Sequence, residues 1–160
     1  MVRSATKNDA QQLVDIYNYY ILNTTVTFEK TPITKEDMQS RVSNVQSKYP
    51  WLVLENDGVL VGYAYATDWK PRYAYRHSIE CTVYLKDGES GNGYGSLLYA
   101  ELIKQLKQLK VHTMIGGIAQ PNPGSIALHE KFGFTKVAHF KEVGFKFEQW
   151  VDVAYWQLIL

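Results

Sequence analysis

A glycine-rich turn in this 160-residue chain joins a predicted strand to the most regular helical pattern in the sequence, and this junction determines much of the topology. Ser78–Leu85 predicts the strand, and Gly91-Asn92-Gly93-Tyr94-Gly95-Ser96 forms the turn. Apolar residues then recur at helical spacing at Leu97, Leu98, Ala100, Leu102, Ile103, Leu106 and Leu109. His112–Ala119 follows as a buried strand. A strand, a helix and a second strand in this order predict a parallel crossover within one sheet.

The remaining predicted elements surround this unit with antiparallel strands and helices. Strands are expected at Val2–Ala5, Trp51–Leu54, Val59–Ala66, Thr135–Phe140 and Phe147–Leu160, and helices after Thr6, after Thr34 and from about Ser125 to Gly133. Asn56-Asp57-Gly58 predicts a tight hairpin, because Asp-Gly tolerates positive φ. The order β-α-α-β-β-β-α-β-α-β-β predicts an α/β fold: a mixed, mostly antiparallel central sheet flanked by helices. We expect residues 1–160 to form a single domain.

Composition excludes several classes of protein. Hydrophobic residues make up 46% and charged residues 21%, which are globular values. Seventeen basic and sixteen acidic side chains leave a net charge of +1, which argues against a binder of nucleic acid or of anionic membranes. One cysteine excludes an internal disulfide, and no signal peptide or transmembrane segment is evident. We therefore expect a cytoplasmic protein.

The glycine turn is the first candidate functional site. Glycines let backbone N–H groups approach an anion, and the dipole of the following helix adds partial positive charge, so a pyrophosphate fits such a turn. A P-loop is excluded because no Lys-Ser/Thr pair follows the last glycine. A dinucleotide fingerprint is excluded because the spacing is G-x-G-x-G and Val111–Ile115 offers no carboxylate for a ribose. An ordinary strand-to-helix turn remains the alternative interpretation.

A second segment, Asn122 to Phe134, contains a short predicted helix that ends at Gly133. Together with the glycine turn it resembles the GNAT superfamily of acetyl-CoA-dependent N-acetyltransferases. That family combines a Q/R-x-x-G-x-G/A pyrophosphate loop with a later N-x-x-[SA]-x-x-L-Y-x-x-x-G-F segment. The resemblance implies the GNAT fold, with acetyl-CoA as co-substrate and no metal.

Further stretches narrow the resemblance to the phosphinothricin acetyltransferase group, over nearly the whole chain. They are Thr25-Val26-Thr27-Phe28, Tyr49-Pro50-Trp51-Leu52-Val53, Gly62-Tyr63-Ala64-Tyr65-Ala66, Trp69-Lys70-x-Arg72-x-Ala74-Tyr75, Glu80-Cys81-Thr82-Val83-Tyr84, Gly93-Tyr94-Gly95-Ser96-Leu97-Leu98-Tyr99 and Trp150-x-Asp152-Val153-x-x-Trp156-Gln157. In that group, acetyl-CoA acylates the amine of phosphinothricin or of close analogues such as methionine sulfoximine and methionine sulfone.

The resemblance also implies roles for individual residues. Glu80 and His129 match the catalytic positions, the latter where many GNAT members have tyrosine. The cofactor-binding positions are Val83, Tyr84, Leu85, Gly91, Asn92, Gly93, Tyr94, Gly95, Ser96 and Asn122, and the substrate-binding positions are Phe28, Lys70, Arg72 and Tyr75. One departure affects cofactor binding: where the loop pattern has Gln or Arg, this chain has Ser90-Gly91. The long side chain that would help to fix the phosphates is missing there.

Elementary chemistry fits these roles. An amine attacks a thioester only when neutral, and an α-amine with a pKa of about 8 is largely protonated at neutral pH, so a base is needed. Glu80 is our candidate base, directly or through water, because burial would raise its pKa toward neutrality. His129 could protonate the departing thiolate, orient the substrate, relay protons or be purely structural. Backbone N–H groups of Val83–Leu85 could polarise the thioester carbonyl. Cys81 alternates to the opposite face and is expected in the core rather than as a nucleophile.

Lys70 and Arg72 precede the candidate catalytic strand. By themselves they are typical of a solvated charge pair, whereas the resemblance makes them a clamp for a carboxylate, phosphinate or sulfone group. Phe28 and Tyr75 could wall the same pocket. The four histidines, at positions 77, 112, 129 and 139, show no i,i+4 pair, so we expect no metal site.

We therefore predict an N-acetyltransferase that acts on a small amino acid, with Glu80 as general base. Two alternatives remain open: a GNAT enzyme acting on a protein N-terminus or a polyamine, and a non-catalytic acetyl-CoA-binding module. The two cations, Lys70 and Arg72, argue against a polyamine. We also predict a homodimer, because Trp150, Val153, Tyr155, Trp156 and Ile159 make the last strand apolar on both faces, and an exposed edge or face of that kind invites a partner.

Overall fold

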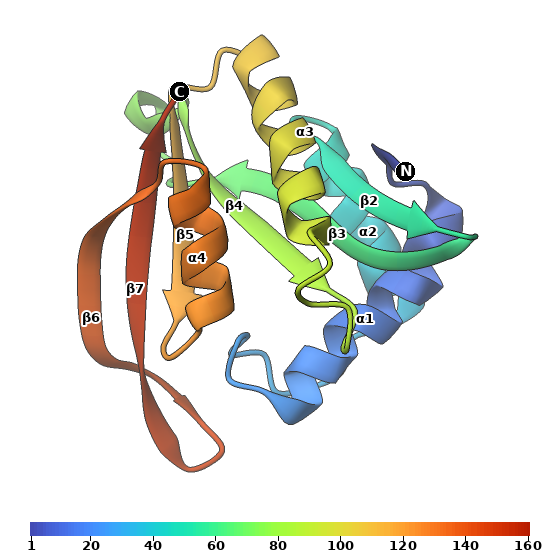
Figure 1. The fold of residues 1–160 in the computed structure, drawn as a ribbon, viewed down its shortest axis with the longest axis horizontal. Helices are drawn as coiled ribbons and strands as arrows, with labels where there is room; N and C mark the ends of the chain where they lie inside the picture. The colour runs from blue at the N-terminus through green and yellow to red at the C-terminus, as the bar shows by residue number, and fades with distance from the viewer.

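The computed structural model describes residues 1–160 and confirms the predicted α/β fold (Figure 1). The strands are β1 (Val2–Ser4), β2 (Trp51–Asn56), β3 (Val59–Asp68), β4 (Ser78–Leu85), β5 (Thr113–Ala119), β6 (Thr135–Lys146) and β7 (Gln149–Ile159). The helices are α1 (Ala10–Asn23), α2 (Lys35–Gln46), α3 (Tyr94–Gln108) and α4 (Pro123–Lys131), with short 3-10 turns at Lys7–Asp9 and Tyr73–Tyr75. None of the helices is both long enough and apolar enough to cross a membrane.

The seven strands form one sheet in the order β1-β2-β3-β4-β5-β7-β6. Every neighbouring pair is antiparallel except β4 and β5, which run parallel because α3 carries the chain back between them. The single crossover predicted from the glycine turn is therefore confirmed.

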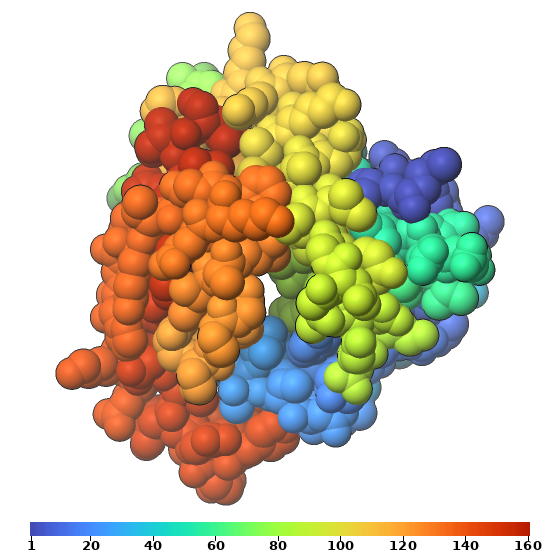
Figure 2. Space-filling view, in the orientation of Figure 1, coloured from blue at the N-terminus to red at the C-terminus, as the bar shows by residue number.

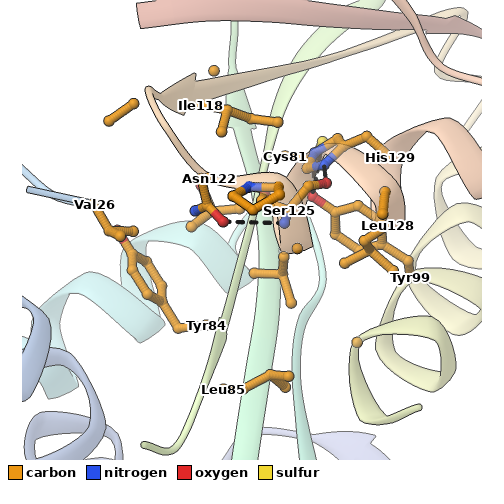
Figure 3. Close-up of a pocket in the computed structure, with 18 of the residues that line it drawn as sticks. Val26, Cys81, Tyr84, Leu85, Tyr99, Ile118, Asn122, Ser125, Leu128 and His129 are labelled. Atoms are coloured by element: carbon orange, nitrogen blue, oxygen red, sulfur yellow. Dashed lines mark hydrogen bonds between the residues drawn. The ribbon is translucent and has the colours of Figure 1, made fainter. Parts of the chain in front are cut away.

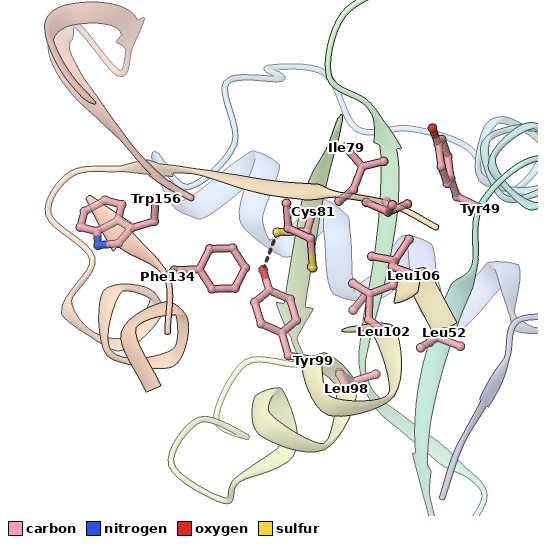
Figure 4. Packing of buried hydrophobic residues seen from close by; sticks show 14 of the residues in the cluster. Tyr49, Leu52, Ile79, Cys81, Leu98, Tyr99, Leu102, Leu106, Phe134 and Trp156 are labelled. Carbon is pink, nitrogen blue, oxygen red and sulfur yellow. Dashed lines mark hydrogen bonds between the residues drawn. The ribbon is translucent and has the colours of Figure 1, made fainter. Parts of the chain in front are cut away.

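The sheet carries a separate apolar core on each face. On one face, Leu98, Leu102 and Leu106 of α3 pack on alternate residues of the central strands (Figure 4). On the other face, α1 and α2 bury Leu13, Ile16, Met38 and Val42 against Trp51, Val53 and Tyr63. Side chains of a strand alternate between the two faces, so the neighbours Leu52 and Val53 serve different cores.

The predicted helix starts have a clear local cause. The Thr34 hydroxyl accepts from the Asp37 backbone N–H at 3.1 Å, while the Asp37 carboxylate accepts from the Thr34 N–H at 3.0 Å. Thr6 and Asp9 form a related pair, in which the Asp9 carboxylate accepts from the Thr6 backbone N–H at 2.7 Å and from the Thr6 hydroxyl at 3.1 Å, and there the pair opens a 3-10 turn that leads into α1. Each pair satisfies backbone donors that the first helical turn leaves free.

The structure differs from the sequence prediction mainly after residue 134. Strand β6 continues to Lys146 rather than ending near Phe140, and its register with β7 shifts between Phe140 and Gly144. Phe147 and Glu148, which have positive φ values of 53° and 58°, form the turn that joins the two strands. Strand β7 is paired on both sides, so the two edge strands of the sheet are β1 and β6, and the last strand is not an edge.

The two parallel strands separate soon after they pair. Only Ser78, Ile79 and Glu80 of β4 are paired with β5, at Thr113, Met114 and Ile115. Beyond Glu80 and Ile115, β4 continues to Leu85 and β5 continues to Ala119 without pairing with each other (Figure 1). We call this divergence of the two strands the fork. The fork leaves backbone N–H and C=O groups of both strands free in the middle of the sheet.

Candidate active site

A cavity of about 1070 Å³ occupies the fork between β4 and β5. Figure 2 shows it as a hollow between the segment that contains the glycine turn, the α4 region and the segment after α1. Its walls come from five regions distant in the sequence: Val26–Phe28, Glu80–Leu85, Ser90–Tyr99, Gly117–His129 and the β6–β7 hairpin. This volume is large enough for an extended ligand.

The glycine turn leaves open space at one end of the cavity. Gly91 and Gly93 have positive φ values of 85° and 79°, and a Cβ added at either would meet nothing within 4 Å. Gly93 is also the N-cap of α3, so the free N–H groups of the first helical turn lie at this end. Gly95 instead allows close packing, since a Cβ there would lie 3.0 Å from Leu128 of α4. The turn therefore has the room, the donors and the helix dipole that a phosphate needs.

Lys131 is a residue at this end that the sequence analysis missed. It ends α4 and lines the cavity, and its Nζ donates to the Ser96 hydroxyl at 2.9 Å. A lysine ammonium therefore lies beside the glycine turn, although Ser90-Gly91 lacks the expected long side chain. Its position 35 residues along the chain from Ser96 gave no local signal in the sequence.

Asn122 and Asn92 take different positions. Asn122 caps α4, where its side-chain oxygen accepts from the Ser125 N–H at 3.1 Å, and it lines the cavity (Figure 3). This bond engages Oδ1 and leaves the amide NH₂ for another acceptor. The Asn92 amide is directed back to Glu89, at 3.4 Å from its carbonyl oxygen, and Asn92 does not line the cavity.

Val83, Tyr84 and Leu85 lie along the free arm of β4. Residues Gly62 to Ala64 of β3 pair with them on one side, and successive backbone groups of a strand point to alternate sides. Those not used by β3 therefore face the open fork. The Tyr20 hydroxyl donates to the Leu85 carbonyl at 2.6 Å and fixes the end of this arm to α1.

Glu80 lies at the point where the fork opens. It is half-buried, lines the cavity, and belongs to the last residue pair between β4 and β5. Burial raises the pKa of its carboxyl group above the usual range, while the positive charge of Lys70 opposes that rise. A carboxylate with a raised pKa in a cavity has the properties of a general base.

His129 is buried, and hydrogen bonds engage both of its ring nitrogens (Figure 3). Nδ1 lies 2.7 Å from the Ser125 carbonyl oxygen, which only accepts, so Nδ1 carries the proton. Nε2 lies 2.9 Å from the hydroxyl of Tyr99 and accepts from it. Burial lowers the pKa of His129, with the hydrogen bond to Ser125 opposing, so the ring is neutral at neutral pH. Tyr99 was missed as a site residue because it is one more apolar-spaced position of α3.

Cys81 has the character of a core residue. Its thiol lies 3.5 Å from the Tyr99 hydroxyl in a buried setting (Figure 4). Burial raises the pKa of the thiol to about 12, so it is not a thiolate at neutral pH.

The predicted substrate residues separate into two groups. Phe28 lines the cavity, together with Val26, Phe140 and Val143, which the sequence analysis did not select. Lys70, Arg72 and Tyr75 lie in the exposed loop between β3 and β4 and do not line it. Of these three residues, Lys70 is the one that influences the cavity, because its charge acts on the Glu80 carboxyl group. Its Nζ lies 5.0 Å from the ring centre of Trp69. The Trp69 ring in turn packs on Tyr155 of the cavity wall, with 5.7 Å between ring centres.

No cluster of three or more His, Cys, Asp or Glu side chains with the geometry of a metal site is present. The site therefore consists of an anion-accepting turn, an open strand arm, a half-buried carboxylate and an apolar wall.

Comparison with known proteins agrees with this geometry. A family profile described as an acetyltransferase (GNAT) domain matches residues 2–155. The chain is 38% identical to the phosphinothricin N-acetyltransferase of Streptomyces viridochromogenes over 98% of this chain and 85% of that protein. It is 34% identical to the L-methionine sulfoximine/L-methionine sulfone acetyltransferase of Salmonella typhimurium over 99% of this chain and 94% of that protein.

A solved structure shows the same fold. It is a GNAT superfamily phosphinothricin acetyltransferase from Sinorhizobium meliloti in complex with acetyl-CoA, at a TM-score of 0.96 and 36% identity, covering 100% of this chain and 88% of that one. On this sequence and structural similarity, the chain belongs to the GNAT family and is an acetyltransferase.

Proposed function

We propose that this enzyme transfers the acetyl group of acetyl-CoA to the α-amine of a small amino acid such as phosphinothricin, methionine sulfoximine or methionine sulfone. The observation that carries the proposal is the arrangement of one cavity. An anion-accepting turn lies at one end, and Glu80, with its raised pKa, lies at the junction of β4 and β5. The names of the relatives, whose acceptors are amino acids, support the acceptor class.

The chemistry assigned to this chain is direct transfer. Glu80 accepts a proton from the ammonium or amine of the acceptor, directly or through a water molecule, so that the nitrogen lone pair attacks the thioester carbon. The C–N bond forms, the nitrogen gives up its remaining extra proton to the departing sulfur or to water, the C–S bond breaks, and CoA leaves as the thiol or thiolate. Free N–H groups of the Val83–Leu85 arm stabilise the negative charge that develops on the carbonyl oxygen.

Acetyl-CoA binding is assigned to both arms of the fork. The turn Gly91–Ser96, with Lys131, accepts the pyrophosphate, the β4 arm pairs with the amide-bearing pantetheine chain, and the Asn122 amide group donates to the same ligand. Of the roles open to His129, its contacts favour the structural one: both ring nitrogens are engaged by Tyr99 and Ser125, so the neutral ring presents no free proton.

The acceptor is assigned to the other end of the cavity, between Phe28 and Glu80. Lys70 and Arg72 lie in the exposed β3–β4 loop, from which the charge of Lys70 acts on Glu80, and we propose that they attract the anionic or strongly polar group of the amino acid as it enters. We propose the same entrance role for Tyr75, which is in the same loop.

The experiment follows free thiol released from acetyl-CoA. Phosphinothricin, methionine sulfoximine, methionine sulfone, methionine and spermidine are compared as acceptors, with Glu80→Gln as the test variant and Glu36→Gln, an exposed glutamate of α2, as its matched control. We expect turnover with the phosphorus and sulfur amino acids, reduced about 10²- to 10⁴-fold in Glu80→Gln and unchanged in Glu36→Gln. The proposed substrate class would be refuted if only spermidine supported turnover, or if none of the five acceptors did.

We also propose a homodimer in a cytoplasmic setting. The edge strand β6 and its hairpin expose a set of large apolar side chains: Val137, Phe140, Val143, Phe145, Phe147 and Trp150. Such a surface along a free strand edge favours a second copy of the chain. The only cysteine is a buried free thiol, which suits a reducing compartment. Light scattering at micromolar concentrations should give twice the chain mass, and Trp150→Glu should shift it toward the monomer; a monomer mass for the unchanged protein would contradict the proposal.

A further inference from the structure

A buried lysine at the end of β6 joins two segments that are distant in the sequence. Lys146 is 1% exposed, although lysine is among the residues least often buried. Its ammonium donates to the backbone carbonyls of Thr24 at 2.7 Å and Thr27 at 2.8 Å, and lies 3.5 Å from that of Tyr20. The edge strand β6 is thereby tied to the segment that follows α1.

The surroundings of Lys146 explain how a charge is kept there. Tyr20 and Thr24 lie at the C-terminal end of α1, where the backbone carbonyls carry the negative end of the helix dipole. The Phe147 ring lies 5.0 Å from Nζ and adds a cation–π contact. Burial, together with the charge of Lys30, lowers the pKa of Lys146. The acceptors of its ammonium are backbone carbonyls and not a carboxylate.

The tied segment carries the candidate acceptor wall. Thr27, whose carbonyl accepts from Lys146, directly precedes Phe28. Two residues before Lys146, Gly144 supports the Phe28 ring so closely that a Cβ added there would overlap it. Lys146 and Gly144, the buried residues at this end of β6, thus hold the backbone and the ring of the same wall segment.

Other contacts hold this segment from the opposite side. The Tyr17 hydroxyl lies 2.9 Å from the Thr27 hydroxyl, and Arg41 makes paired hydrogen bonds of 2.9 and 2.7 Å with Glu29. These contacts come from α1 and α2, whereas the Lys146 contacts set the position of the segment relative to the β6–β7 hairpin. Figure 2 shows the two segments meeting below the hollow.

The cavity lining shows why this position matters. Val26, Thr27 and Phe28 from one segment and Phe140 and Val143 from the hairpin line the same cavity. We propose that Lys146 is a positioning residue for the acceptor: by tying the carbonyls of Thr24 and Thr27 to β6, it sets the width of the pocket end formed by Phe28 and the hairpin. The inference rests on the proposed function, since it assigns that end to the amino acid.

The first test replaces the ammonium with an apolar side chain of similar length. In Lys146→Met we expect the KM for the amino-acid acceptor to rise about tenfold, while the KM for acetyl-CoA stays within about twofold of the unchanged enzyme. The matched control is Lys141→Met, an exposed lysine on the same strand, which should leave both values unchanged. Equal acceptor KM values for Lys146→Met and the unchanged enzyme would overturn the inference.

A second variant keeps the test informative if Lys146→Met does not fold. Gly144→Ala should displace the Phe28 ring, which is 38% exposed and can move outward, and should raise the acceptor KM at least about threefold. In a Phe28→Ala background the same substitution should have no further effect, because the ring it displaces is absent. An equal effect of Gly144→Ala in both backgrounds would show that it does not act through Phe28.

A third readout does not depend on turnover. Amide hydrogen exchange of residues 24–28 should be at least about tenfold faster in Lys146→Met than in Lys141→Met, with unchanged exchange in β4 and β5. If the unchanged enzyme acetylates no amino acid but this local difference is present, the proposed function fails while the tie stands. If amino acids are acetylated and neither exchange nor acceptor KM changes, the proposed function stands and the role of Lys146 fails.

Discussion

Removal of a single oxygen atom should test the buried network around His129. In Tyr99→Phe the ring and its packing in α3 remain, and only the hydroxyl that donates to His129 Nε2 at 2.9 Å is lost. Nδ1 stays committed to the Ser125 carbonyl at 2.7 Å, so the imidazole cannot turn its proton toward the vacated position without breaking that bond. Nε2 would then be a buried acceptor with no donor.

The structure sets the size of the effect. Tyr99 is 0% and His129 is 3% exposed, so both groups are shielded from bulk water, which would otherwise replace the lost donor. An unsatisfied buried acceptor costs about 1–3 kcal/mol of unfolding free energy. For a domain of this length, that corresponds to a fall in Tm of about 2–12 °C.

The assay is thermal and urea denaturation of Tyr99→Phe beside Tyr73→Phe, the same change at a tyrosine that is 78% exposed. The control should lose less than about 0.5 kcal/mol. Replacing His129 in the Tyr99→Phe protein should recover part of the lost unfolding free energy, because the double variant no longer contains the unsatisfied Nε2. A Tyr99→Phe protein as stable as the control would refute the assigned hydrogen bonds and the fixed tautomer of His129.

Three further predictions concern charge. Because burial raises the pKa of Glu80, the acidic limb of kcat/KM against pH should lie above the usual carboxylate range of about 4.3, with activity rising as the base loses its proton; a rate profile flat down to pH 4 would contradict this. Lys131→Met should raise the KM for acetyl-CoA about three- to tenfold, less so in high salt, whereas Lys107→Met on α3 should not. Because the pKa of His129 is lowered, the unfolded chain binds a proton that the native state does not. The unfolding free energy should therefore fall as the pH drops below about 6.5. Urea denaturation between pH 5 and 8 should show this dependence, and it should be weaker in His129→Gln.

Local chemistry explains which elements could be predicted. Asp57 and Gly58 do adopt positive φ, at 49° and 79°, so the hairpin was visible in the sequence as a turn signal. The parallel crossover followed from a strand, a glycine turn and a strong helical period. In contrast, the β6–β7 turn has Phe147 and Glu148 at positive φ, and these residue types carry no turn signal. The sequence therefore predicted the end of β6 too early, near Phe140 and not at Lys146.

The candidate site was predictable where motifs are contiguous and not where partners are distant. Gly91 and Gly93 could be assigned to the turn from spacing alone. The pairing of Tyr99 with His129 across 30 residues, and of Lys131 with Ser96 across 35, depends on how α3 packs against α4. Lys146 is the extreme case, because it lay between two predicted strands, where a lysine is normally solvated, and nothing local indicates that it is buried.

The fork in the sheet has a mechanical consequence. The strands β1–β4, with α1 to α3, form one plate and β5–β7, with α4, form another, and within the sheet the plates are joined through only three residue pairs at the base of the fork. Bending of the molecule should therefore concentrate at Ser78–Glu80 and Thr113–Ile115. At the open end of the fork, the contacts of the β6–β7 hairpin with the segment after α1 should limit that bending. A ligand that contacts both β4 and β5 would restrain the motion of the two plates relative to each other. The enzyme should therefore be most rigid when a ligand occupies its cavity.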